Sequence, residues 1–347
     1  MLASQPGTIC VVRLSAIGDT CHALAVVRRL QDNWPGSKIT WIIGRTEAAL
    51  MAGIDGVEFI IFDKSAGLRA YRDLRRQLKD RRFDVALCMH ASMRANFLYP
   101  LIQSPLRLGF DKARARDFQW LFTNQRIPAG KKEHAMEAMM GFAAAIGAKE
   151  KPLRWDIPIS DEDQAIASDL ASRQGPFAVI SPCTSSRARN FRNWPADRFV
   201  HIAHLLEQRG LHVVLTGGPT PIEKAYGTEI AAACRAANLI GRTSLKQLIA
   251  VMRASRLVIC PDSGPAHMAT AAGVPVVGLY ATSNPDRTGP YLSRQWVANR
   301  YPDAVRHYMG FDVDEVRWGQ RVRDPEAMTM ISIDDVAQKI DKLLQKA

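Results

Sequence analysis

Short apolar runs rich in β-branched residues alternate along this chain with segments of helical periodicity. In its first half these runs lie at four places: Thr8–Leu14, Lys38–Gly44, Val57–Asp63 and Asp84–Met89. Strands buried on both faces of a parallel sheet have this continuous apolar character, because helices cover both faces. The alternation therefore predicts an α/β fold with a doubly wound parallel sheet.

The pattern is interrupted once and then repeats. Residues Lys149–Ser160, "KEKPLRWDIPIS", are polar and contain prolines, which suits a connection between domains. A helix is predicted near Ala196–Arg209, and further strands at Phe177–Pro182, His212–Thr216, Arg256–Cys260 and Val276–Tyr280. A chain of 347 residues is also long for one domain. We predict a first domain over residues 1–155, a second over 156–332 and a C-terminal helix over 333–347.

Composition restricts the compartment and the kind of partner. The net charge of +12 favours an anionic partner, although zinc-finger spacing and RNA-binding signatures are missing, so nucleic acid is disfavoured. No apolar run approaches the roughly 20 residues of a membrane span, and the N-terminus does not resemble a signal peptide. The six cysteines form no CxxC pair and are interpreted as buried free thiols. We expect a cytoplasmic protein.

Loops that follow strands are where ligands bind in open parallel sheets. The first such loop, "RLSAIGDTCHAL", has one glycine and no GxGxxG motif, so it does not favour a dinucleotide. It carries Asp19 at the start of a helix. Asp19 is explained equally well as a first-turn acid that complements the helix dipole and as a general base.

The second half carries three further loops of this kind. In "CTSSRARNFRNWP", the hydroxyls of Thr184 and Ser185 precede several arginines, which suits a phosphate group or a solvated basic loop. In "LTGGPTPIE", Gly217 permits close approach of a ligand, and Glu223 is either a ribose ligand or an ordinary early-helix glutamate. The third loop, "CPDSGPAH", leads from a strand into a helix.

Several pieces of the sequence, in this order, resemble the lipopolysaccharide heptosyltransferases, glycosyltransferase family 9, along nearly the whole chain. They are "RLSAIGDTCHALAVV", "NWP", "TGGP" and "LIGRTSLKQLIAVMRASRLVICPDSGPAHMATAAGVPVVGLYATSNPDRTGPY". The central stretch containing "HASMRANFLYP" looks closest to heptosyltransferase I. The resemblance implies the GT-B fold, in which two Rossmann-like domains face each other across a cleft. It also implies an inverting glycosyltransferase that moves L-glycero-D-manno-heptose from ADP-heptose to a Kdo residue of the lipid A inner core in lipopolysaccharide biosynthesis.

The resemblance assigns roles to individual residues. Asp19 is the implied catalytic base, and the implied acceptor-binding residues are Arg94, Arg116 and His134. The implied donor-binding residues are Thr184, Ser185, Arg192, Gly217, Glu223, Asp262, Ser263, Gly264 and His267. From the residues alone, His267 is better explained as a structural histidine. The scheme requires no metal site and no cofactor, although a divalent cation could stimulate the reaction.

The implied acceptor also gives the positive charge a use. Basic residues of the first domain would meet an acidic Kdo–lipid A glycolipid in the cytoplasmic face of the inner membrane, so we expect peripheral membrane contact. Two other classes remain open. One is a GT-B transferase or epimerase that uses another nucleotide sugar, and the other is a non-catalytic nucleotide-binding module.

Overall fold

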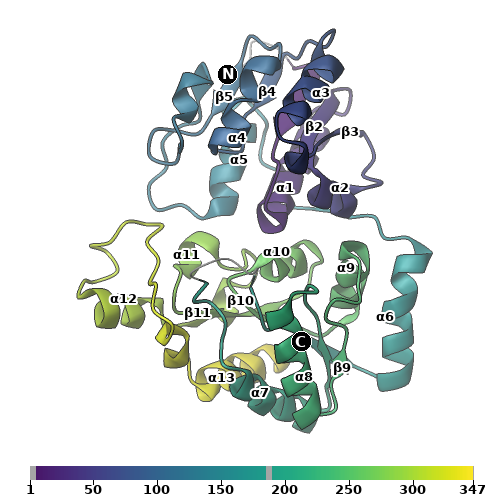
Figure 1. Cartoon of the computed structure of the whole chain (residues 1–347), viewed down its shortest axis with the longest axis vertical. Coiled ribbons are helices and arrows are strands. Elements are labelled where there is room, and N and C mark those ends of the chain that lie inside the picture. Colours follow the sequence, from purple (N-terminus) through teal and green to yellow (C-terminus); the bar gives the residue numbers. More distant parts are fainter. Residues whose placement is uncertain (1–4, 185–189, 347) are drawn as a thin grey trace. The chain divides into compact units, whose positions relative to one another are not determined.

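We describe a computed structural model of the chain, in which residues 5–184 and 190–346 are described (Figure 1). The chain divides into two compact units, Met1–Pro158 and Ile159–Ala347. The boundary predicted from the sequence lies slightly earlier, after residue 155.

The first unit is built on a parallel sheet with the strand order β3-β2-β1-β4-β5-β6. The strands are β1 (Thr8–Val12), β2 (Lys38–Gly44), β3 (Val57–Phe62), β4 (Val85–Leu87), β5 (Arg107–Gly109) and β6 (Gln125–Arg126). Its helices are α1 (Ile17–Asn33), α2 (Arg45–Met51), α3 (Leu68–Leu78), α4 (Met93–Asn96) and α5 (Ala135–Ala145), with 3-10 turns at η1 (Lys64–Ala66), η2 (Tyr99–Leu101) and η3 (Gln119–Leu121).

The second unit repeats this plan with the strand order β12-β11-β10-β7-β8-β9. Its strands are β7 (Phe177–Ile180), β8 (His212–Leu215), β9 (Ala237–Asn238), β10 (Val258–Pro261), β11 (Val276–Tyr280) and β12 (Ala298–Asn299). Its helices are α6 (Asp161–Gln174), α7 (Ala196–Gln208), α8 (Pro221–Ala233), α9 (Leu245–Ala254), α10 (Gly264–Ala271), α11 (Pro285–Thr288), α12 (Tyr301–Met309) and α13 (Ile333–Leu344), with 3-10 turns at η4 (Arg294–Trp296) and η5 (Ala327–Met330).

The apolar runs form strands because both faces of each sheet are covered. In β1, Cys10 and Val12 belong to a buried cluster with Leu74 of α3. Ile9 and Val11, which alternate with them and point to the opposite face, are also fully buried. This two-sided burial is the physical reason why the strands read as continuous apolar runs.

The C-terminal helix α13 belongs to the core of the second unit. Ile340 of α13 and Phe199 of α7 lie in the same buried cluster, and the two helices lie side by side in Figure 1. The indole of Trp194, just before α7, donates a hydrogen bond of 3.0 Å to the carbonyl of Ile331, just before α13. The last helix is therefore fixed to the sheet by apolar packing and by a buried hydrogen bond.

The segment before the boundary is held against α1. Arg154 forms an ion pair with Asp32 at 2.6 Å, and the indole of Trp155 donates to the carbonyl of Cys21 at 2.9 Å. Arg28 donates in return to the carbonyl of Trp155 at 3.0 Å. The connection predicted over Lys149–Ser160 therefore becomes part of the first unit up to about Pro158.

Each sheet has one point where the winding direction reverses. In the first unit this point lies between β1 and β4, and in the second it lies between β7 and β10. The loops beyond the carboxyl ends of these strand pairs diverge and leave room for ligands. The candidate residues should therefore be sought at these two points.

All six cysteines are free, and Cys10, Cys21, Cys88, Cys183 and Cys260 are buried. Burial raises the pKa of the Cys21 and Cys260 thiols to about 12. Among the described residues, no helix combines the length and the apolar composition that crossing a bilayer requires.

Candidate functional site

The first reversal point brings an arginine and an aspartate together. Arg13, directly after β1, pairs with the carboxylate of Asp19 in the first turn of α1. A second nitrogen of the same guanidinium donates to the carbonyl of Met89, beyond β4, at 2.6 Å. The Arg13 side chain is 10% exposed, whereas that of Asp19 is 39% exposed. A buried cation thus holds a solvent-accessible carboxylate in one orientation at the carboxyl edge of the sheet.

His90 lies beside this pair at the end of the β4 segment. Its Nδ1 accepts a hydrogen bond from the backbone N–H of Leu14 at 3.2 Å. Burial, and next the positive charge of Arg13, lower the pKa of His90 to about 3. The imidazole is therefore neutral at ordinary pH and is a poor proton acceptor. Asp19 remains the group in this cluster that is suited to accept a proton.

Arg94 and Arg116, predicted from the resemblance to contact an acceptor, are both exposed. The segments that carry them are tied together by Asp117, because its carboxylate accepts from the N–H of Met93 at 2.9 Å and its carbonyl accepts from the side-chain amide of Asn96 at 2.6 Å. The charge of Arg94 also helps to lower the pKa of His90. Arg94 is therefore an electrostatic neighbour of the Asp19 cluster.

His134, the third predicted acceptor residue, is buried at the start of α5. Its Nδ1 accepts from the N–H of Met136 at 3.0 Å, and its own N–H donates to the Glu137 carboxylate at 3.0 Å. Its ring lies 5.9 Å from that of His22 in an edge-on arrangement. His134 therefore caps α5 in the interior of the first unit.

The second reversal point is closed by Arg192 and Asp262. The Arg192 guanidinium donates to the Asp262 carbonyl at 2.8 Å and lies 3.5 Å from its carboxylate. Arg321 approaches the same carboxylate at 4.0 Å. The loop after β7 is thus joined to the turn after β10 mainly through the Asp262 carbonyl, beside a carboxylate side chain that is only 8% exposed.

The turn after β10 leads directly into α10. Ser263 is the residue before the helix, but its hydroxyl donates back to the carbonyl of Pro261 at 3.0 Å and makes no capping hydrogen bond. Gly264 begins the helix, and His267 lies in its first turn, both half-buried. The first amide groups of α10, together with the positive end of the helix dipole, suit an anion.

The loops after β7 and β8 complete this edge. The N–H of Thr184 donates to the side-chain oxygen of Asn193 at 2.9 Å. Ser185 lies outside the described residues. Glu223, buried in the first turn of α8, accepts from the N–H of Gly218 at 2.7 Å and from the Thr220 hydroxyl at 2.5 Å. Glu223 therefore shapes the glycine loop that includes Gly217, and a ribose hydroxyl would use its remaining lone pairs.

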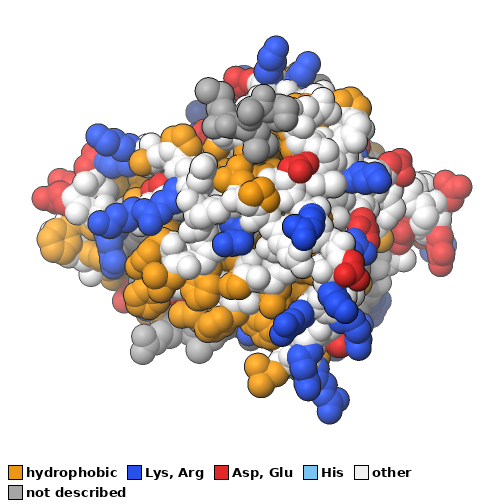
Figure 2. Space-filling model, turned by 90° about the horizontal axis from the view of Figure 1, so that it is seen from above, with side chains coloured by type: hydrophobic (Ala, Val, Ile, Leu, Met, Phe, Trp, Pro, Cys, Tyr) orange, Lys and Arg blue, Asp and Glu red, His pale blue; other side chains and the backbone are white. Residues whose placement is uncertain are grey.

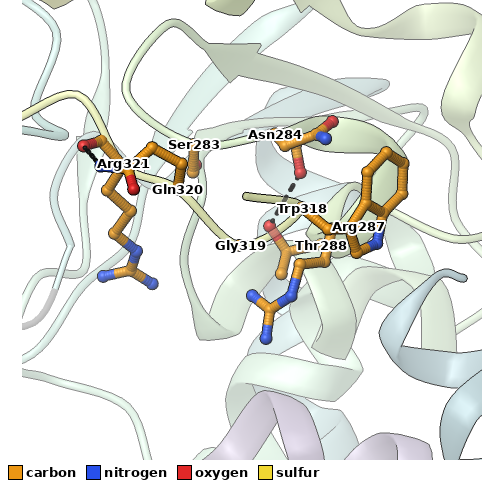
Figure 3. Close-up of a pocket in the computed structure, with 8 residues that line it drawn as sticks. All are labelled: Ser283, Asn284, Arg287, Thr288, Trp318, Gly319, Gln320 and Arg321. Atoms are coloured by element: carbon orange, nitrogen blue, oxygen red, sulfur yellow. Dashed lines mark hydrogen bonds between the residues drawn. The ribbon is translucent and has the colours of Figure 1, made fainter. Parts of the chain in front are cut away.

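A small polar pocket lies beyond β11, next to the turn after β10 (Figure 3). It is lined by Ser283, Asn284, Arg287, Thr288, Trp318, Gly319, Gln320 and Arg321. In Figure 3 the guanidinium groups of Arg287 and Arg321 extend toward the same side. Arg321, which lines this pocket, also lies 4.0 Å from the Asp262 carboxylate in the predicted donor turn.

Sequence reasoning missed Arg13, His90 and Arg321. Arg13 and His90 stand directly after predicted strands, which was a usable signal. Arg321 follows no core strand; it reaches the site through an isolated antiparallel bridge to Ser283, so its sequence position offered no such signal.

Comparison with known proteins identifies related chains. The family "Glycosyltransferase family 9 (heptosyltransferase)" matches residues 71–307. The lipopolysaccharide core heptosyltransferase OpsX of Haemophilus influenzae is 35% identical over 345 residues, which is 99% of each chain. The lipopolysaccharide heptosyltransferase 1 of Salmonella typhimurium is 25% identical over 302 residues, or 83% of this chain and 92% of that protein.

Solved structures of similar fold agree with this match. A glycosyltransferase family 9 protein from Veillonella parvula has a TM-score of 0.78 at 22% identity, with 98% of each chain covered. The E. coli heptosyltransferase WaaC with ADP has a TM-score of 0.75 at 19% identity, covering 97% of this chain and 99% of that one. WaaC has also been solved with ADP-2-deoxy-2-fluoro heptose. The predicted GT-B fold class is confirmed.

Proposed function

Because the chain belongs to glycosyltransferase family 9 and is a heptosyltransferase of lipopolysaccharide core synthesis, we propose that it transfers L-glycero-D-manno-heptose from ADP-heptose to a Kdo residue of lipid A, with inversion. The observation that carries the proposal is the exposed Asp19 carboxylate held by buried Arg13 beside neutral His90. An oriented carboxylate of this kind can take the proton of an attacking sugar hydroxyl.

The second unit holds the donor in this proposal. The diphosphate lies at the N-terminus of α10, where Gly264 permits close approach and the amide groups, His267 and Arg192 offer hydrogen bonds and positive charge. Thr184 contributes a hydroxyl from the adjacent loop. The ribose lies by Gly217 and Glu223 in the loop after β8. The ADP in the related WaaC structure supports a nucleotide of this kind.

The transfer is a single displacement. Asp19 takes the proton from a Kdo hydroxyl as its oxygen bonds to the anomeric carbon of the heptose. The bond from that carbon to the diphosphate oxygen breaks, and the electron pair leaves with ADP. Arg192 and the α10 N-terminus stabilise the negative charge that grows on the diphosphate, which is the largest electrostatic demand of the step. Attack opposite to the leaving group inverts the anomeric configuration.

Release of ADP from ADP-heptose, measured with and without Kdo–lipid A, tests the proposal. We expect release that depends on the acceptor, and a product whose anomeric configuration by NMR is opposite to that of the donor. Release that requires an acceptor already carrying heptose would replace Kdo with a later acceptor. A product of retained configuration would exclude the single displacement.

A further inference from the structure

Five large apolar side chains are exposed within one stretch of the first unit. They are Met93 (40% exposed), Phe97 (53%), Phe118 (54%), Trp120 (40%) and Leu121 (71%). We call these residues the aromatic patch. A single exposed apolar residue needs no explanation, but a group that contains two phenylalanines and a tryptophan marks an interaction surface.

Hydrogen bonds and ring contacts connect the segments that carry the aromatic patch. The bonds from Met93 and Asn96 to Asp117 tie α4 to the segment that carries Phe118. The rings of Phe118 and Trp120 stack edge-on with centroids 5.3 Å apart, and those of Phe97 and Phe122 lie 5.6 Å apart. The segment around Asp117 is therefore held against α4, although the two are more than twenty residues apart in the sequence.

The backbone also has an unusual conformation at this surface. Asp117 and Phe118 have φ values of 52° and 59°, in the left-handed region that glycine normally occupies. An aromatic residue adopts this region only where surrounding contacts impose it. Here the preceding residue, Asp117, is anchored to α4 by two hydrogen bonds, and the Phe118 side chain is 54% exposed.

Positive charge accompanies the aromatic patch. Between residues 91 and 130 the sequence has six Lys or Arg and two Asp or Glu, and Arg94, Lys112, Arg116 and Arg126 are exposed. Figure 2 shows a face of the molecule on which hydrophobic side chains gather beside Lys and Arg side chains. Exposed aromatic rings combined with basic side chains match the interface of an anionic bilayer, where rings enter the headgroup region and cations meet phosphates.

We propose that the aromatic patch docks the enzyme on the surface of an anionic lipid bilayer. The inference deepens the proposed function and rests on it in one respect, because a lipid A acceptor is anchored in such a bilayer. Phe118, Trp120 and Leu121 enter the interface, and the neighbouring basic side chains bind the lipid phosphates. The exposed Asp19 carboxylate, which lies in the same unit, is thereby brought to the surface that carries the acceptor.

The test uses the full chain and vesicles without acceptor. Binding is measured by co-sedimentation with vesicles of phosphatidylethanolamine and phosphatidylglycerol, and with vesicles of phosphatidylcholine alone. Wild-type protein should bind the anionic vesicles and lose affinity as salt is raised. The double variant Phe118→Ser with Leu121→Ser should bind at least about tenfold more weakly. The matched control is Leu292→Ser with Phe311→Ser, which alters side chains 51% and 53% exposed in the second unit and should bind like wild type.

Each other result overturns the docking surface. The docking surface is excluded if the wild-type protein fails to bind anionic vesicles. It is also excluded if the double variant binds them as tightly as wild type. A change from dimer to monomer in the double variant, seen by analytical ultracentrifugation, would assign the aromatic patch to a second copy of the chain. If the double variant fails to fold, two single variants replace it. Leu121→Ser should bind the anionic vesicles more weakly than wild type. Trp120→Phe should lose the blue shift in tryptophan fluorescence that the wild-type protein shows on vesicles.

These vesicles contain neither donor nor acceptor, so their result is independent of heptose transfer. If vesicle binding holds while Kdo–lipid A accepts no heptose, the proposed function fails and the docking surface stands. With an active enzyme, the double variant should raise KM for lipid acceptor in vesicles at least severalfold and leave KM for a deacylated acceptor unchanged. An equal rise for both acceptors would overturn the docking role.

Discussion

At the scale of single residues, the chemistry of the first unit depends on how Asp19 is held. A first-turn aspartate is common as a partner of the helix dipole, and such a residue needs no arginine. The buried Arg13 adds an oriented partner and fixes the carboxylate from one side. The Asp19 side chain nevertheless remains 39% exposed, so its carboxylate is accessible to solvent, as a general base requires.

Replacing Asp19 with asparagine should test this interpretation. The amide keeps nearly the same shape but cannot accept the proton, so we expect turnover to fall roughly 10²- to 10⁴-fold with ADP binding intact. The matched control is Asp73→Asn, since Asp73 also pairs with an arginine, Arg76, on the surface of the first unit. The measurement is steady-state ADP release together with ADP binding by calorimetry. Near-normal turnover in Asp19→Asn would return this residue to a purely structural role.

The neutral state of His90 gives a prediction about stability and pH. Its pKa is about 3 in the folded chain and about 6.5 when unfolded, so between these values the unfolded state binds more protons. The contribution of neutral His90 to the free energy of unfolding is therefore complete above about pH 6.5 and is lost as pH falls toward 3. The expected slope is up to about 1.4 kcal/mol per pH unit.

Chemical denaturation between pH 4.5 and 7 measures this effect. Asparagine can still accept the hydrogen bond from Leu14 but does not titrate, so His90→Asn should show a shallower loss of unfolding free energy on the acid side. His212→Asn, at an exposed position that begins β8, should keep the wild-type slope. Identical slopes in His90→Asn and wild type would show that His90 is not held neutral.

At the scale of elements, the proposed donor site consists of loops that are held by residues at helix ends. The Glu223 carboxylate, in the first turn of α8, accepts hydrogen bonds from the Gly218 N–H and the Thr220 hydroxyl. Arg192 joins the loop after β7 to the turn after β10. These contacts fix the backbone before any ligand arrives. Preorganisation of this kind lowers the cost of ordering on binding.

The two interpretations of Glu223 can be separated with 2′-deoxy-ADP and 3′-deoxy-ADP. If Glu223 binds the ribose, wild-type protein should bind one of these analogues about tenfold or more weakly than ADP, and Glu223→Gln should reduce that difference. If it only shapes the loop, the difference should be the same in both proteins. Glu223→Ala should in addition cost about 1–3 kcal/mol of stability, because Gly218 and Thr220 lose their acceptor. Calorimetric binding and thermal unfolding provide both measurements.

The sequence predicted those elements whose cores give a periodic signal. The runs near Thr8–Leu14 and Val276–Tyr280 became β1 and β11 because both faces are buried. The strands β5, β6, β9 and β12 were missed, since two or three residues carry no periodicity. Asp19 could be identified as a candidate from its position after a strand, but its partner Arg13 and the pKa of His90 depend on burial and on contacts across β4. Such tertiary effects cannot be read from local spacing.

At the scale of the whole molecule, the two units carry different parts of the proposed reaction. Each has its own parallel sheet, its own buried core and its own reversal point. The base and the exposed arginines lie in the first unit, whereas the α10 N-terminus and Arg192 lie in the second. Replacing a substrate-binding residue in one unit should therefore change KM for the substrate that this unit is proposed to bind.

We expect the double variant Arg94→Ala with Arg116→Ala to raise KM for the lipid acceptor by about tenfold or more, because charge-assisted hydrogen bonds to phosphate or carboxylate groups are lost. KM for ADP-heptose should stay unchanged. Arg192→Ala should instead raise KM for ADP-heptose and leave KM for the lipid acceptor unchanged. It should also lower kcat, since the charge on the diphosphate grows in the transition state. Arg69→Ala with Arg72→Ala, which removes two exposed arginines of α3, controls for the loss of positive charge in the first unit. Initial rates over a grid of both substrate concentrations measure kcat and the two KM values of each variant. If the Arg94 and Arg116 variant changed only KM for ADP-heptose, the acceptor could not be bound where we propose, because both arginines belong to the first unit and the diphosphate is proposed to bind the second.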